Sequence, residues 1–272
     1  MKKLPPHKGV YILPNLITTA SLFCAFVSLT WVTRGMFESA ALAIFFAALL
    51  DGLDGKVARL TNTSSPFGVE YDSLADLVAF GVAPAFLLFN WQLQDYGRYG
   101  LAVCFIFAAC GAMRLARFNI TTSTGSKKFF TGLPIPGAGC TIAALVLFMP
   151  HMPVSFYQYL PPFCFGLGLL LAILMVSRVR YYSFKDFGIV KAYPMRSLVA
   201  VLIVFAIVFI NPKLMAFLIL LGYVLAGMIY TLVLMLRSRR LGKRNAHEPH
   251  ASPATPAAGS TVTRDASEND QG

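Results

Sequence analysis

Four aspartates in a short stretch of this sequence have the residue type and the spacing that metal-assisted chemistry requires. Asp51 and Asp54 are three residues apart, and Asp72 and Asp76 are four residues apart. Either spacing places both carboxylates of a pair on one face of a helix. Residues 51–76 contain no histidine or cysteine, and ligation by oxygen atoms alone favours Mg²⁺ or Mn²⁺ over zinc. The sequence therefore predicts a carboxylate site for Mg²⁺ or Mn²⁺, with two ions per site.

The residues between the two aspartate pairs favour a phosphate-containing ligand. A single acidic pair could equally be a solvated helix end, or could pair with Lys56 and Arg59. Gly55 and Gly68, however, carry no Cβ where a nucleotide or phosphate would approach, and Ala58 leaves room one helical turn further on. The guanidinium of Arg59 is a planar fork that fits phosphate oxygens. Two metal ions suit phosphoryl transfer. Prenyl transfer also uses paired aspartates, but its acidic motifs normally lie far apart on separate helices.

The elements that position these carboxylates are expected to be membrane-spanning helices. Hydrophobic residues make up 57% of the chain and charged residues 13%, about half the charged share of a soluble protein. We expect an all-α polytopic membrane protein with about eight helices that cross a hydrocarbon core of ~30 Å. The expected spans are 15–33, 37–57, 74–92, 99–117, 135–151, 161–177, 197–211 and 214–236. The second and third spans run in opposite directions, so their adjoining ends bring the aspartate pairs together.

The positive charges predict the orientation of these spans. With the N-terminus in the cytoplasm, every Lys and Arg except Arg34, Arg98 and Lys213 falls on the cytosolic side or face, as the positive-inside rule requires. Both termini and the aspartate site are then cytosolic, in a cytoplasmic membrane of bacterial type. The net charge of +11 thus indicates topology and attraction to anionic lipids, with no nucleic-acid partner.

Three regions are expected along the chain. Residues 1–14 form a basic interfacial N-terminus, 15–236 form the membrane-embedded catalytic domain, and 237–272 form a basic and then disordered tail.

The stretch from Asp51 to Asp76 resembles the signature of the CDP-alcohol phosphotransferases, D-x-x-D-G-x-x-A-R-x(8)-G-x-x-x-D-x-x-x-D, at every fixed position. Four other stretches resemble the bacterial integral-membrane phosphatidylserine synthases of that family. They are Glu70-YDSLADLVAFGVAP-Ala85, Cys110-GAMRLARFN-Ile120, Phe130-TGLPIPGA-Gly139 and Leu174-MVSRVRYYSF-Lys185. The resemblance covers about residues 11 to 200, and the last two expected spans carry nothing diagnostic.

The resemblance implies a reaction and roles for the motif residues. An alcohol, here L-serine, would attack the β-phosphorus of CDP-diacylglycerol and release CMP, in a homodimer whose catalytic core has six of the spans. Metal ligands in this scheme are Asp51, Asp54, Asp72 and Asp76, and Asp76 is also the general base. The implied CDP-binding residues are Gly55, Ala58, Arg59 and Gly68.

Two further groups of polar residues are candidates outside the motif. Asn15 and Thr18 open the first span at the same membrane face and could bind nucleotide or metal, although helix capping explains them equally well. Arg114 and Arg117 end the fourth span, and an arginine fork matches the carboxylate of serine. Arg178 and Arg180 end the sixth span at the same face, and the loop from Arg178 to Lys185 is the next candidate for serine binding. Snorkelling towards the membrane surface is the ordinary use of such arginines.

Two alternatives to the transfer of a phosphatidyl group to serine remain open from the sequence. A sister enzyme would use glycerol 3-phosphate, inositol phosphate or choline as the acceptor. A lipid-binding or transport protein would not catalyse a reaction at all. The intact four-aspartate motif favours an enzyme, because a carrier has no need of a base beside two metal ions.

Overall fold

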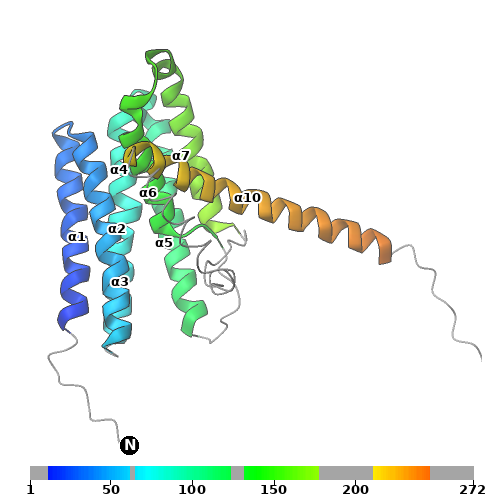
Figure 1. Cartoon of the computed structure of the whole chain (residues 1–272), viewed down its shortest axis with the longest axis horizontal. Helices are drawn as coiled ribbons and strands as arrows, with labels where there is room; N and C mark the ends of the chain where they lie inside the picture. Colours follow the sequence, from blue (N-terminus) through cyan, green and yellow to red (C-terminus); the bar gives the residue numbers. More distant parts are fainter. Residues whose placement is uncertain (1–11, 62–64, 124–131, 178–210, 246–272) are drawn as a thin grey trace, which may run out of the picture. The chain divides into compact units, whose positions relative to one another are not determined.

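The structure, a computed structural model, describes residues 12–61, 65–123, 132–177 and 211–245. Every element in these ranges is helical, which confirms the expected all-α class. The α-helices are α1 (Ile12–Thr33), α2 (Phe37–Leu60), α3 (Pro66–Asp76), α4 (Ala83–Leu88), α5 (Gly97–Ser123), α6 (Ile135–Phe148), α7 (Leu160–Val176) and α10 (Pro212–Asn245) (Figure 1). Between them lie the π-helices η1 (Leu77–Val82) and η2 (Phe89–Leu93), and the 3₁₀ segments η3 (Gln94–Tyr96), η4 (Met149–His151) and η5 (Val154–Tyr159).

The chain is a multi-pass membrane protein. Four of the described helical segments are long and apolar enough to span a membrane, and these are Ile12–Thr33, Pro66–Ile120, Val154–Val176 and Pro212–Ile229. A shorter apolar helix covers Ile135–His151. The 24 residues of α2 are interrupted by Asp51, Asp54 and Lys56 near one end, so its apolar run is shorter than its length. Eight spans are therefore not shown, and most of the expected span 197–211 lies outside the described residues.

Two of the expected spans, 74–92 and 99–117, belong to one helical stretch that folds back on itself. The 55 residues of Pro66–Ile120 would extend for about 82 Å as a straight helix, far more than a bilayer accommodates. Gly97 has φ +50° and ψ −121°, a conformation that glycine adopts without steric cost. The chain reverses there, so that α5 packs along η2, α4 and η1.

The chain separates into two compact units, Met1–Leu232 and Val233–Gly272. The second unit contains the last residues of α10, through Asn245. The predicted boundaries of the membrane domain at 15–236 and of the tail at 237–272 stay predictions.

Helices α1 and α2 lie side by side (Figure 1) and are held together by hydroxyl groups. The Ser21 hydroxyl donates to the Ala47 carbonyl at 3.0 Å, and the Ser28 hydroxyl donates to the Ala40 carbonyl at 2.9 Å. The serines are seven residues apart and their acceptors are seven residues apart in the opposite order, which defines an antiparallel register. Small residues let two membrane helices approach closely enough for such contacts, and Ala25 is fully buried between them. Seven residues after Ala47 along α2, the same spacing leads to Asp54.

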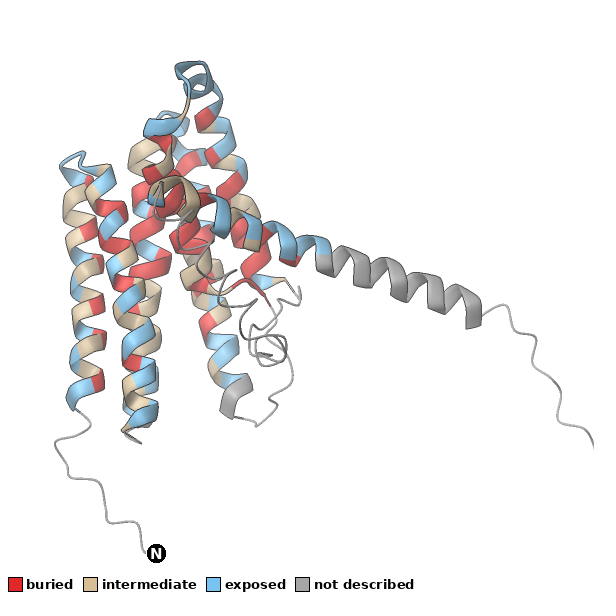
Figure 2. Ribbon diagram, in the orientation of Figure 1, coloured by how far each residue is buried: buried red, intermediate tan, exposed pale blue. Residues whose placement is uncertain are grey.

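Helix α6 is almost completely enclosed by other helices. Nearly all of its side chains are buried (Figure 2), and it packs against α2, η1 and α4. A helix that is surrounded by others is apolar on every side, which explains why the stretch 135–148 carries no charged residue.

The π-helix η1 begins directly after Asp76 and is fitted closely to α6. Pro84 has no N–H, so it cannot donate to the Phe80 carbonyl as an α-helix would require. The helix widens instead, and the Ala83 N–H donates to the Val78 carbonyl, five residues back. A Cβ on Gly139 of α6 would lie 2.8 Å from the Phe80 carbonyl oxygen. Glycine at 139 therefore lets α6 approach the turn that follows Asp76.

We predict that Gly139→Ala destabilises the protein and lowers its activity. The added methyl group forces α6 away from η1, and overpacking of this kind costs roughly 1–3 kcal/mol. The matched control is Gly166→Ala in α7, where an added Cβ meets nothing within 4 Å. That variant should be neutral or slightly more stable, because alanine favours helix by about 1 kcal/mol over glycine. Equal unfolding midpoints for the two variants in detergent would contradict the fit between α6 and η1.

Candidate metal centre

The first turn of α3 sets the position of two of the four motif aspartates. Ser65 has an extended backbone, and its hydroxyl accepts a hydrogen bond from the Gly68 N–H at 3.0 Å. A serine N-cap followed by proline is a strong start signal for a helix, and Pro66 occupies the first position. Asp72 and Asp76 then fall on the second and third turns.

Three of the four predicted metal ligands come together. One carboxylate oxygen from each of Asp51, Asp72 and Asp76 lies within 4.8 Å of the others, and all three side chains are half-buried. Two oxygens bound to the same Mg²⁺, each about 2.1 Å away, are at most about 4.2 Å apart. The observed spacing therefore fits a divalent cation after a small movement, or two cations that share a carboxylate. Such an ion offsets the repulsion among the three negative charges.

The fourth predicted ligand, Asp54, is held separately by α1. Its side chain is 4% exposed, and one carboxylate oxygen accepts a hydrogen bond of 2.7 Å from the Thr18 hydroxyl. Thr18 is also 3.1 Å from the Pro14 carbonyl oxygen. Its single hydroxyl hydrogen can serve one of these acceptors at a time. In this structure Thr18 thus contacts a predicted metal ligand, and its predicted contact with a nucleotide or a metal stays a prediction.

The residues predicted to bind CDP surround the same end of α1, α2 and α3. A Cβ on Gly68 would lie 3.2 Å from the Asn15 side-chain oxygen, so Asn15 reaches the first turn of α3. Gly55 has open space where a Cβ would be. The Arg59 side chain is exposed, and its Nε donates to the Gly55 carbonyl at 2.8 Å. Ala58 is half-buried. This end of the bundle can therefore admit a ligand beside the carboxylates.

Three hydrogen bonds that sequence reasoning missed fix α3 between its neighbours. On one side, the Thr19 and Tyr71 hydroxyls are 2.9 Å apart and join α1 to α3. On the other side, the Asn119 amide of α5 donates to Glu70 at 3.2 Å and to Ser73 at 3.1 Å. These contacts fix the rotation of α3 about its axis, and hence the direction of Asp72. The only available signal was the unusual density of polar residues on both sides of Asp72.

The two arginines predicted for serine binding differ in burial, and Arg114 is the half-buried one. Within the part of the chain that the structure describes, its Nε is buried without a hydrogen-bond partner. Its guanidinium lies 5.9 Å from the centre of the Phe118 ring, and it interacts electrostatically with Asp76. Arg117, by contrast, is exposed. An arginine with a buried, unsatisfied N–H is a natural partner for an anionic ligand group.

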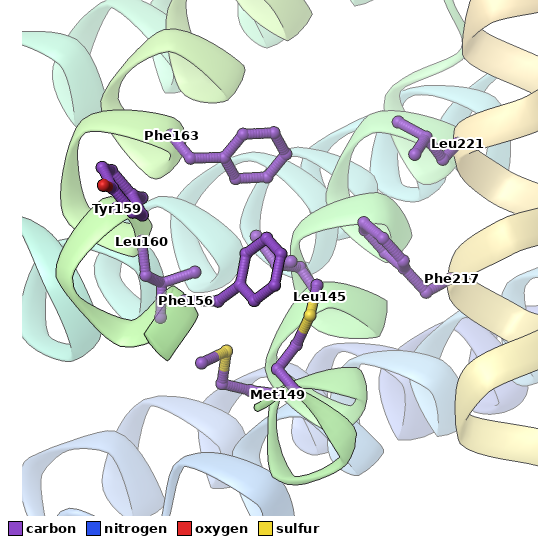
Figure 3. A pocket seen from close by; sticks show the side chains of 9 residues that line it. Leu145, Met149, Phe156, Tyr159, Leu160, Phe163, Phe217 and Leu221 are labelled. Atoms are coloured by element: carbon purple, nitrogen blue, oxygen red, sulfur yellow. The ribbon is translucent and has the colours of Figure 1, made fainter. Parts of the chain in front are cut away.

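A large cavity elsewhere in the molecule differs from the carboxylate site, because its lining is apolar. Its volume is about 400 Å³, and its walls are apolar side chains that include Leu145, Phe163 and Phe217 (Figure 3). Tyr159 brings a phenol group, and none of the described residues that line the cavity is charged. A reaction site needs several converging polar groups. The carboxylates, where several polar groups converge, are therefore the stronger candidate for a reaction site.

Comparison with known proteins gives a consistent result. A family model described as CDP-alcohol phosphatidyltransferase matches residues 11–179, which include α1 to α7. The CDP-diacylglycerol–serine O-phosphatidyltransferase of Helicobacter pylori strain J99 is 40% identical over 237 residues, covering 85% of this chain and 96% of that protein. A protein of the same name from Bacillus subtilis strain 168 is 33% identical over 174 residues, covering 64% of this chain and 91% of its own length. The archaetidylserine synthase of Methanothermobacter thermautotrophicus is 33% identical over 180 residues, covering 65% and 72%.

We predict that Asp51→Asn and Asp72→Asn each weaken Mn²⁺ binding at least tenfold. Each change removes a negative charge and a good oxygen ligand from a group of three, while the side-chain shape is kept. Binding can be measured on the purified protein from the electron paramagnetic resonance signal of free Mn²⁺, independently of catalysis. The control is Asp95→Asn, a change at an exposed carboxylate in η3. An unchanged Mn²⁺ titration in either variant removes that aspartate from the metal site.

Proposed function

The chain belongs to the CDP-alcohol phosphatidyltransferase family, and from this premise we propose that it transfers the phosphatidyl group of CDP-diacylglycerol to L-serine, giving phosphatidylserine and CMP. The observation that carries the proposal is the convergence of Asp51, Asp72 and Asp76 within 4.8 Å inside the family signature. Serine as the acceptor is supported by relatives that are named for this activity, one of which matches over 96% of its length.

The proposed reaction is an in-line displacement at phosphorus. The serine hydroxyl oxygen attacks the β-phosphorus of CDP-diacylglycerol, the bond to the CMP oxygen breaks, and the hydroxyl proton passes to the Asp76 carboxylate. Mg²⁺ or Mn²⁺ held by the aspartates would neutralise the pyrophosphate and stabilise the leaving CMP. Asp51, Asp54 and Asp72 complete the proposed ligand set, which we expect to hold two ions. A positioned base of this kind typically contributes a factor of about 10² to 10⁴ in rate.

The remaining residues of the site would bind and orient the CDP-lipid. Gly55, Ala58, Arg59 and Gly68 form the proposed nucleotide-binding part, and Asn15 lies against Gly68. Thr18 is best supported as a positioning residue, because its hydroxyl holds Asp54. The rotation of α3, fixed by its polar neighbours, keeps Asp72 and Asp76 directed at the reacting phosphates.

Arg114 is the proposed partner of the serine carboxylate. It combines a buried N–H that lacks a partner among the described residues with an electrostatic interaction with Asp76. The reacting hydroxyl of serine is two bonds from the carbon that bears the carboxylate, so both groups can be held at once. Arg117 is the second candidate, since it is on the same helix and exposed.

The wider organisation follows the same proposal. We infer eight spans with six in the catalytic core, both termini and the metal site on the cytosolic side, and a homodimer in a cytoplasmic membrane of bacterial type. The distribution of Lys and Arg along the sequence supports the orientation. The family resemblance supports the six-span core and the dimer.

We predict serine-dependent release of CMP from CDP-diacylglycerol by membranes that contain the protein. Release should require Mn²⁺ or Mg²⁺, and mass spectrometry should identify phosphatidylserine as the lipid product. Asp76→Asn in the same membranes should lose a factor of about 10² to 10⁴, because the amide cannot accept the proton. Equal release with glycerol 3-phosphate, inositol phosphate or choline would indicate a sister enzyme. No release with any alcohol would favour a lipid-binding or transport protein.

We also predict that Arg114→Lys raises the KM for serine about tenfold and leaves the KM for CDP-diacylglycerol unchanged. Lysine keeps the charge but loses the two-pronged hydrogen bond, and hydrogen bonds to charged groups contribute about 1.5–3 kcal/mol. Arg117→Lys tests the second candidate in parallel. Arg98→Lys, at an exposed arginine at the start of α5, is the control. If Arg114→Lys leaves both constants unaltered, serine is bound by another group.

A further inference from the structure

The apolar cavity lies at the other end of α6 from the carboxylates. Its lining comes from α6, η4, η5, α7 and α10, and all of these residues belong to the first compact unit, Met1–Leu232. Gly139, near the beginning of α6, packs on the turn that follows Asp76. Met149, which lines the cavity, comes ten residues later, about 15 Å further along a helix. The cavity is therefore separate from the metal centre.

The cavity is formed where three apolar helices reach the same membrane surface. Phe163 is in the first turn of α7 and Phe217 is in the second turn of α10. One turn before Phe217, the Lys213 ammonium forms an ion pair of 2.7 Å with Glu38, and both side chains are partly exposed. Tyr159 of the cavity wall is 63% exposed. Exposed charges and tyrosines are typical of the membrane–water interface, so the cavity begins just below the surface opposite the carboxylates.

Exposed aromatic side chains line the opening of the cavity. The rings of Phe156, Phe163 and Phe217 lie around the space (Figure 3). Phe217 is buried, whereas Phe156 is 54% exposed and Phe163 is 46% exposed. Phe163 lies in the apolar segment Val154–Val176, which is long enough to span a membrane. In a multi-pass membrane protein, apolar side chains exposed along such a segment face lipid. Lipid chains therefore have access to the cavity.

The chemistry of the lining favours a hydrocarbon ligand. Among the described lining residues, Tyr159 alone carries a hydroxyl, and water does not occupy a cavity that offers it so few hydrogen-bond partners. An apolar cavity of about 150 Å³ holds a benzene ring. The volume here is about 400 Å³, so it has room for more than twice as many carbon atoms. A long alkyl chain meets these requirements, and the bilayer supplies such chains beside the opening.

We propose that this cavity binds one acyl chain of a bilayer lipid from the leaflet opposite the metal centre. The stacked rings of Phe148 and Phe217, whose centres are 4.9 Å apart, join α6 to α10 beside the cavity. The bound acyl chain extends this contact and packs between α10 and the ends of α6 and α7. The lipid is distinct from the substrate, because the proposed reaction takes place at the other membrane surface.

The test uses the full-length protein in phosphatidylethanolamine vesicles, with a small fraction of the same lipid carrying a photoreactive diazirine in one acyl chain. After irradiation, mass spectrometry should find the lipid attached to lining residues such as Met149 and Leu160. Leu221→Trp places an indole in the cavity, and attachment to residues 145–163 should fall about tenfold because little room is left for an acyl chain. Phe163→Trp narrows the opening and should lower the attachment by a second route.

The matched control is Leu218→Trp, the same change on the same helix at a side chain that is 47% exposed and does not line the cavity. Attachment to residues 145–163 should equal that of the wild type. The unfolding midpoint of each variant in detergent shows whether it is folded. If Leu221→Trp lowers the midpoint, Phe163→Trp decides the question, because Phe163 is partly exposed and tolerates a larger ring.

Two results would overturn the proposal. If no lipid attaches to the lining residues of the wild-type protein, the space is filled by protein, either by another part of this chain or by a second copy. If lipid attaches equally to the wild type and to the folded Leu221→Trp and Phe163→Trp variants, it contacts only the outer surface of the helices. Neither measurement involves release of CMP, so the inference and the proposed function stand or fall separately.

Discussion

Repulsion among carboxylates at the end of apolar helices is the constraint on which the arrangement of this protein depends. Asp51, Asp72 and Asp76 place oxygens within 4.8 Å of one another in a chain of which 57% is hydrophobic. Charges in such surroundings are costly unless they are paired or bound to a cation. The carboxylate cluster therefore adds no stability to the folded protein by itself. The surrounding helices must hold the three carboxylates together against their mutual repulsion when no cation is bound.

Helix α1 does much of this work without contributing a charge. Its hydroxyl groups bind the backbone of α2 through Ser21 and Ser28, the carboxylate of Asp54 through Thr18, and the phenol of Tyr71 through Thr19. Hydroxyls are well suited to this position because they satisfy acceptors in an apolar setting at a small desolvation cost. The two helices that bear the aspartates, α2 and α3, are thus both hydrogen-bonded to α1. These shared contacts keep the distance between α2 and α3 fixed.

Sequence reasoning predicted the all-α class and the meeting of the aspartates, whereas the eight spans and the roles of the site residues stay predictions. The spacing of the aspartates along the chain predicts their common face, because helical periodicity is local information. The separate contact of Asp54 with Thr18, and the preference for Arg114 over Arg117, depend on which helices are neighbours, and no local pattern encodes that. The spans were predicted from apolar length, which places a break between 92 and 99 where the chain reverses at Gly97. The carboxylates within α2 shorten its apolar run, and the count of eight stays a prediction. The π-helices were missed, since Pro84 reads only as an interruption of the apolar pattern.

The π-helix after Asp76 has a consequence for how this protein could change over evolutionary time. A π turn is equivalent to an α-helix that has gained one residue. Loss of a single residue from 77–82 would restore the α-helix and rotate everything downstream by about 100°. Asp72 and Asp76 would keep their places, whereas the surface that packs on α6 would turn away from it. Insertions and deletions at this point therefore alter the packing of the bundle while the spacing of the four aspartates along the chain stays the same.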